Sequence, residues 1–211
     1  MKKFWIIAAL AAFVILLPAC SSSTKQPNTI KASKEVVQLY KFSTEETRIL
    51  ASFGMDSKAH VFAFKAPASA KALHVNIYRL NKDGAWEGGK GGKILLSEND
   101  PPEWKLEGNV ALLANNDHSF TYRINTVGCA SYTSDPVAAN TEFSQADATL
   151  VQEKVIELGK EIPVFLSVCN KGMSMESFSV DDYFSPEKFK HMDLVQAVTI
   201  SFTSESQDTY H

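Results

Sequence analysis

Beyond residue 34 the chain repeatedly alternates apolar and polar positions with a period of two. The clearest case is Ala72–Leu80, where Leu73, Val75 and Ile77 fall on one side and polar residues on the other. This period is typical of a half-buried β-strand, because successive side chains point to opposite faces. The same pattern predicts further strands at residues 36–42, 59–65, 93–97, 105–114, 119–125, 162–169 and 193–203.

Two segments suit either a strand or a helix. Residues 48–53 alternate like a strand, whereas residues 44–47 (Thr-Glu-Glu-Thr) resemble the start of a helix. We favour the strand, because residues 54–57 then form a turn into the next strand. The apolar spacing of residues 150–158 also fits both structures. There we favour a strand that pairs with residues 162–169.

The remaining segments are read as turns and connections. Residues 115–117 (Asn-Asn-Asp) tolerate left-handed backbone angles and predict a hairpin turn between their flanking strands. Residues 128–148 are polar and predict a long surface connection. Residues 177–180 predict an edge strand. Ser185 as a cap, with Pro186 at the first helical position, predicts a short helix.

Short strands separated by turns of Gly, Pro, Asn and Asp predict an all-β fold. We expect an antiparallel β-sandwich, immunoglobulin-like or jelly-roll-like, with at most one or two short helices. Residues 34–211 are expected to form it as a single domain, since a segment of this length suits one domain and can bury a substantial core.

The beginning of the chain has a different pattern. A basic start at residues 1–3 precedes an uncharged apolar run at residues 4–17, which is typical of an export signal and too short for a membrane span. The run closes on Leu17-Pro18-Ala19-Cys20, which resembles the lipobox of bacterial lipoproteins. The resemblance implies that residues 1–19 are a signal peptide and that Cys20 is diacylated. The protein would then be held at the cell envelope, outside the cytoplasm, by lipid on Cys20.

Composition adds a tether and excludes one class of partner. Residues 20–33 have few apolar side chains and predict a flexible tether between the lipid and the domain. The formal net charge of the 211-residue chain is −3, and the charged residues are scattered. Without a basic patch, no nucleic-acid partner is expected. Cys129 and Cys169 form an even pair in an exported protein, so they are read either as a disulfide or as two free thiols.

Known catalytic and metal-binding motifs are absent from the sequence, so we expect no enzyme and no cofactor. His60 and His74 could bind zinc if their strands paired, but structural or surface roles are favoured. The acidic turns at residues 98–100, 115–117 and 181–182 could offer oxygen ligands to calcium, although exposed turns use the same residues for backbone reasons. No metal site is therefore predicted.

Two tryptophans beside turns are the candidate binding residues. Trp86 lies near Asp83, and Trp104 lies near Asp100. Sugar-binding sandwiches use such aromatics as flat platforms, with carboxylates at the polar edges of the sugar. The alternative is that each tryptophan plugs one end of the core.

Three hypotheses about function follow. The first is a non-catalytic binding module for a glycan, a cell-wall fragment or another surface ligand. The second is a structural or accessory envelope lipoprotein that acts through a protein partner, and the third is a metal-dependent or other hydrolase. A solvent-exposed tryptophan flanked by carboxylates favours the first, whereas an exposed apolar patch favours the second.

Overall fold

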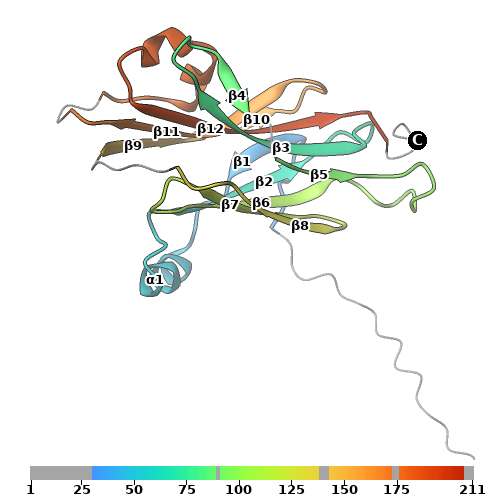
Figure 1. The fold of residues 1–211 in the computed structure, drawn as a ribbon. Coiled ribbons are helices and arrows are strands. Elements are labelled where there is room, and N and C mark those ends of the chain that lie inside the picture. The colour runs from blue at the N-terminus through green and yellow to red at the C-terminus, as the bar shows by residue number, and fades with distance from the viewer. Residues whose placement is uncertain (1–29, 89–90, 138–142, 173–175, 207–211) are drawn as a thin grey trace, which may run out of the picture.

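A computed structural model describes residues 30–88, 91–137, 143–172 and 176–206, and in it two antiparallel sheets face each other (Figure 1). The first sheet contains, in spatial order, β10 (Lys154–Val155), β1 (Val36–Leu39), β2 (Ala59–Lys65), β6 (Glu107–Ala114), β7 (Phe120–Asn125) and β8 (Cys129–Thr133). The second contains β4 (Trp86–Gly88), β3 (Ala72–Leu80), β12 (Leu194–Thr203), β11 (Glu161–Asn170) and β9 (Ser144–Thr149), with β5 (Gly92–Leu95) also paired to β3. The predicted antiparallel β-sandwich is confirmed.

The main core lies between the two sheets. The apolar parity of β3 points inward, so Leu73 and Val75 are fully buried against Phe62 and Phe64 of β2. Phe202 of β12 packs on Phe64 with ring centroids 5.4 Å apart. Alternation therefore identified the inward face of β3 correctly.

A second, smaller core covers the outer face of the second sheet. Leu166 of β11 and Val195 of β12 are buried there beneath Tyr183 and Phe189. The covering residues come from two 3-10 helices, η1 (Val180–Phe184) and η2 (Pro186–Phe189), which lie over this sheet on the side away from the first sheet (Figure 1). This is why β11 and β12 are apolar on both faces.

The predicted strand at residues 48–53 is wrong, because this segment belongs to the helix α1 (Thr44–Ser52). Its start is a capping box. Ser43 Oγ accepts from the Glu46 amide at 3.2 Å, and the Glu46 carboxylate accepts from the Ser43 amide at 2.7 Å. None of the residues of α1 is buried, and the helix stands clear of the sandwich beyond the first sheet (Figure 1).

Three further expectations fail at the edges of the sheets. The polar segment 128–148 contains two strands, β8 and β9, which lie at sheet edges and so need few apolar residues. Of the predicted strand at residues 150–158, only the two residues of β10 form a strand. β10 pairs with β1 and not with residues 162–169. Residues 177–180 form no strand, and Val180 begins η1 instead.

The short helix predicted to start at Ser185 and Pro186 is present as the 3-10 helix η2.

The hairpin between β6 and β7 is confirmed, and His118 in its turn has a φ of 58°. The predicted signal peptide, Cys20 and most of the tether lie outside the described residues. The end of the predicted tether is packed, since Ala32 is buried and Asn109 donates to the carbonyl of Ile30 at 3.1 Å. The folded part therefore includes residues 30–33. No helix in the described ranges combines the length and apolar character that a bilayer crossing requires.

Candidate functional site

A groove with a volume of about 450 Å³ lies between β5 and the start of β8. We call it the Trp104 groove. It is lined by Lys93, Ile94, Leu95, Leu96, Asp100, Trp104, Val127, Gly128 and Cys129. Both Asp100 and Trp104 of the predicted site therefore lie in one concave surface, together with an exposed thiol that the sequence did not connect to them.

The loop between β5 and β6 positions these two side chains. The Asp100 carboxylate accepts from the Ser97 amide at 2.8 Å, and the Trp104 amide donates to the Pro101 carbonyl at 2.9 Å. Both contacts are local, and the two ends of the loop are also tied to neighbouring segments, since the Leu96 amide donates to the Lys71 carbonyl at 2.7 Å and the Ala66 amide donates to the Leu106 carbonyl at 2.8 Å. The Trp104 side chain remains 42% exposed.

The chemistry of the Trp104 groove suits a ligand with one flat apolar face and polar edges. An indole ring offers an apolar surface at a small cost in conformational entropy, and Asp100 offers an acceptor beside it. Ile94, Leu96 and Val127 supply apolar surface to the rest of the lining. A pyranose ring has this combination of faces.

Trp86 has a different role. Its ring stacks on Tyr183 with centroids 5.0 Å apart, and its indole N–H donates to the Tyr183 carbonyl at 2.9 Å. It also contacts the edge of Phe189. Trp86 thus packs against the outer core, and its ring is not an open platform. This position is closer to the alternative in which the tryptophan fills part of the core.

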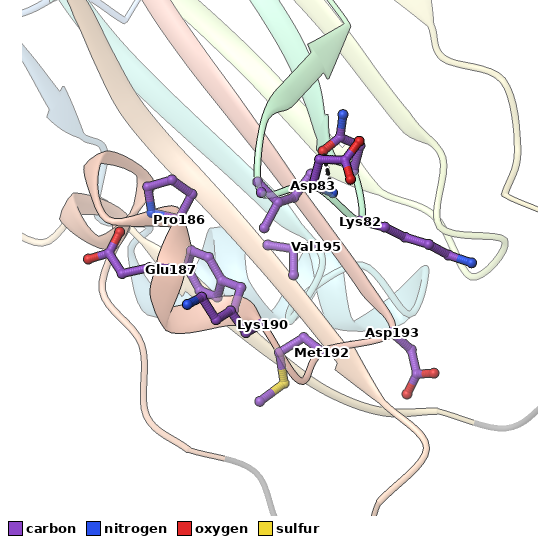
Figure 2. Close-up of a pocket in the computed structure, with 12 residues that line it drawn as sticks. Lys82, Asp83, Pro186, Glu187, Lys190, Met192, Asp193 and Val195 are labelled. Atoms are coloured by element: carbon purple, nitrogen blue, oxygen red, sulfur yellow. Dashed lines mark hydrogen bonds between the residues drawn. The ribbon is translucent and has the colours of Figure 1, made fainter.

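Asp83 lies in a second cavity, separate from the Trp104 groove. This cavity has a volume of about 520 Å³ and lies between the β3–β4 turn and η2 (Figure 2). We call it the η2 cleft. The four predicted binding residues are therefore divided among three places: Asp100 and Trp104 line the Trp104 groove, Asp83 lines the η2 cleft, and Trp86 packs against the outer core.

A polar cluster around one carboxylate, Glu161, lies on the outer face of the second sheet, and the sequence analysis did not predict it. Glu161 accepts hydrogen bonds from Tyr78 at 2.5 Å, Tyr183 at 2.6 Å, Asn76 at 3.1 Å and Thr199 at 3.3 Å. Burial and the bond to Glu161 raise the pKa of Tyr78 to about 12 and raise that of Tyr183 further. The polar parity of β3 marked Asn76 and Tyr78 as outward, but η1 reaches this face from a distant part of the chain.

The two cysteines are free thiols in different sheets. Cys129 is exposed on β8, whereas Cys169 is fully buried on β11. The Cys169 sulfur lies 3.8 Å from His118 Nδ1, yet burial raises the pKa of this thiol to about 11. A buried, protonated thiol is a poor nucleophile, so this pair has the features of a packed core contact.

The strands that carry His60 and His74 do not pair, because β2 and β3 belong to different sheets. In each histidine Nε2 is buried and has no hydrogen-bond partner among the residues that the structure describes, and burial lowers the pKa of both rings. Within the described ranges, no group of three or more His, Cys, Asp or Glu side chains is placed to hold a metal ion.

The carboxylates of the acidic turns are engaged by other groups of the protein. Asp117 accepts from the amide and hydroxyl of Ser119, at 3.1 and 2.6 Å. Asp181 pairs with Lys154 at 2.9 Å, and Asp182 pairs with Lys188. The Asp117 contacts are those expected of a turn, whereas the two lysine pairs are exposed ion pairs.

No family model matches the chain, and searches of the curated proteins and of the solved structures likewise find no match. Function is therefore inferred from the geometry of this chain's own residues.

Proposed function

We propose that this chain is a lipid-anchored extracytoplasmic protein whose β-sandwich binds a cell-surface glycan or cell-wall fragment, without catalysis, in the Trp104 groove. The single observation that carries the proposal is the exposed indole of Trp104 beside Asp100 in one groove. The lipobox resemblance at Cys20 supports the location, because it implies an anchor that keeps the domain at the envelope.

In this proposal the sugar ring stacks on Trp104, and a sugar hydroxyl donates to Asp100. The groove is open to solvent, so a ring within a longer chain could enter from the side. Burying one face of a pyranose on an indole removes apolar surface from water, which contributes about 25 cal/mol per Å². Affinity of this kind is modest for one ring and grows with each further ring that finds a contact.

The test uses the full chain, purified in mild detergent. Thermal unfolding is followed with an N-acetylglucosamine oligosaccharide series, a muramyl dipeptide and a neutral glycan panel. A ligand that binds only the folded state stabilises it by about 2.7 kcal/mol at a hundredfold excess over Kd. The matched variants are Trp104→Ala, which removes the platform, and Phe53→Ala, which removes an aromatic that is 72% exposed at the C-cap of α1.

We expect a sugar-dependent rise in melting temperature that disappears in Trp104→Ala, persists in Phe53→Ala and partly returns in Trp104→Phe. Cys129 gives a second readout, since it lines the groove and is exposed. Bound sugar should slow its alkylation by iodoacetamide. A sugar effect that survives in Trp104→Ala, or no effect from any sugar, would contradict the proposal.

A protein partner is the second candidate, and α1 is the observation that favours it. Ile49 and Phe53 lie one helical turn apart and are 61% and 72% exposed. Short helices that bury nothing are marginal in water, and a partner could cover this pair. Cross-linking in intact envelopes that is lost in an Ile49→Ser, Phe53→Ser variant, but not in Trp104→Ala, would favour this candidate over glycan binding.

A further inference from the structure

The η2 cleft is the largest cavity among those described above, and glycan binding leaves it unexplained. One wall is the β3–β4 turn with Lys82 and Asp83, and the other is η2 with Glu187 and Lys190 (Figure 2). Val195 lies between the walls. Each wall thus has one cationic and one anionic side chain.

The turn that forms the first wall is held in place by its own residues. The Asn81 side-chain oxygen accepts from the amides of Asp83 and Ala85, both at 2.9 Å, and its amide group donates to Glu87 at 2.7 Å. Gly84 has a φ of 79°, a left-handed conformation that suits glycine. The positions of Lys82 and Asp83 are therefore set before any ligand arrives.

The second wall is tied to the first through the outer core. Trp86, on the strand that follows the turn, donates to the Tyr183 carbonyl and contacts Phe189 of η2. Tyr183 in turn donates to Glu161 of the sheet. A cavity whose walls are fixed to each other in this way loses little conformational entropy when a ligand binds.

The floor and the walls differ in chemistry. Phe189 and Val195 are each 2% exposed, and with Leu80 and Met192 they make an apolar floor. Above it, the side chains of Lys82, Asp83 and Lys190 have no hydrogen bond or salt bridge to another side chain in the described part of the chain. Asp193 is already engaged by Lys171, at 3.5 Å. Three charges, two positive and one negative, thus border the cleft without partners.

We propose that the η2 cleft binds a short peptide that carries both a free ammonium and a free carboxylate group. An apolar side chain of the peptide would lie on the floor, its ammonium would pair with Asp83 or Glu187, and its carboxylate with Lys190 or Lys82. The volume of about 520 Å³ falls within the range typical of small-ligand sites. Complementary charges on both walls favour a zwitterion over a simple cation or anion, since either alone would meet like charge on each wall.

The probe is the unblocked tripeptide Ala-Leu-Ala, titrated into the full chain in mild detergent by calorimetry. We expect saturable binding that weakens about tenfold when the peptide is N-acetylated or C-amidated, because each block removes one charge-assisted contact. Asp83→Asn and Lys190→Gln should each have a similar effect. Both residues are exposed, so neither change should prevent folding.

The control variant is Lys41→Gln, which removes an exposed lysine before α1, and binding should be unchanged. Binding should also persist in Trp104→Ala, so the two proposed sites fail or succeed separately. No binding of the unblocked peptide, equal binding of the doubly blocked peptide, or indifference to both Asp83→Asn and Lys190→Gln would overturn the proposal.

Discussion

At the scale of single residues, the half-buried imidazoles of His60 and His74 are expected to make stability depend on pH, because the Nε2 atom of each ring is buried. His60 packs against Phe62 and Phe165, with ring centroids 6.4 and 5.0 Å away, and within the described part of the chain its Nε2 has no hydrogen-bond partner. Burial lowers its pKa, and the charge of Asp147 offsets this only in part. His74 is shifted in the same direction, also mainly by burial. The neutral form of both rings is therefore the one that the fold favours.

We expect the free energy of unfolding to fall as the pH is lowered from about 7.5 to 5. In the unfolded chain histidine titrates near pH 6.5, above its pKa in the folded state, so the unfolded state takes up protons first. The contribution of the two neutral rings to the free energy of unfolding is fully present above about pH 6.5. It is lost as the pH falls toward their lowered pKa in the folded state. Urea unfolding at a series of pH values measures this, and His60→Phe should reduce the slope while keeping an aromatic ring in place. An unchanged slope in a variant that is folded at pH 7.5 would contradict the assignment.

At the scale of elements, the capping box of α1 makes a local prediction. Ser43→Ala removes the acceptor for the Glu46 amide, which costs a helix about 1 kcal/mol. Because α1 buries no residue, the loss should be confined to the helix. Amide exchange within residues 44–52 should accelerate about fivefold with no change in the global melting temperature.

The matched control for α1 is Ser52→Ala. Its hydroxyl donates to the Arg48 carbonyl at 2.9 Å within the helix and takes no part in the capping box. Exchange should be almost unchanged in this variant. If Ser43→Ala instead lowered the global melting temperature by several degrees, α1 would be part of the cooperative fold.

A second element-scale prediction concerns Glu161, which joins η1 to β3, β11 and β12. Glu161→Gln replaces one acceptor oxygen with an amide donor and leaves a tyrosine hydroxyl without its acceptor, at a cost of about 1–3 kcal/mol. Urea unfolding should show this loss, whereas Glu157→Gln, at an exposed salt bridge with Lys160, should change stability by less than about 1 kcal/mol. Equal effects would mean that Glu161 does not hold η1 on the sheet.

Sequence reasoning succeeded where an element buries at least one face and failed where burial is small or absent. The alternation in β3 and β12 reports a real inner face. In α1 the residues Ile49 and Phe53 are compatible with a period of two and with helical spacing, and only the capping box decides between them. β9 is a polar edge strand, so its partner β11 determines it more than its own composition does.

The candidate sites show the same limit. Trp86 and Trp104 both lie beside turns, and nothing local separates an exposed ring from a packed one. The difference comes from Tyr183, which is 97 residues from Trp86 in sequence and covers its ring. The pairing of Asp100 with Trp104 was predictable, because they lie in one loop. The η2 cleft was not, because its walls come from segments more than a hundred residues apart.

At the scale of the whole molecule, the proposed sites lie in different parts of the sandwich. The Trp104 groove lies where β5 of the second sheet meets β8 of the first, whereas the η2 cleft lies on the outer face of the second sheet. The described chain begins beside β2 and β6 of the first sheet, where Ala32 and Ile30 pack. A tether entering at that sheet would leave the η2 cleft, on the far side of the second sheet, accessible to a ligand.

Anchoring through Cys20 is the prediction that the whole arrangement depends on. In cells supplied with labelled palmitate, the full chain should incorporate label, and Cys20→Ser should not, because the lipobox resemblance places the acylated thiol there. Cys129→Ser, which removes the exposed thiol of the domain, is the control and should keep the label. Two or three acyl chains bind a bilayer stably, since each buried CH₂ contributes about 0.8 kcal/mol, whereas one chain binds weakly. Wild-type protein should therefore stay with membranes through high-salt washing. Label retained in Cys20→Ser, or absent from the wild type, would contradict anchoring through Cys20. The proposal that the Trp104 groove acts at the envelope would then lose its support.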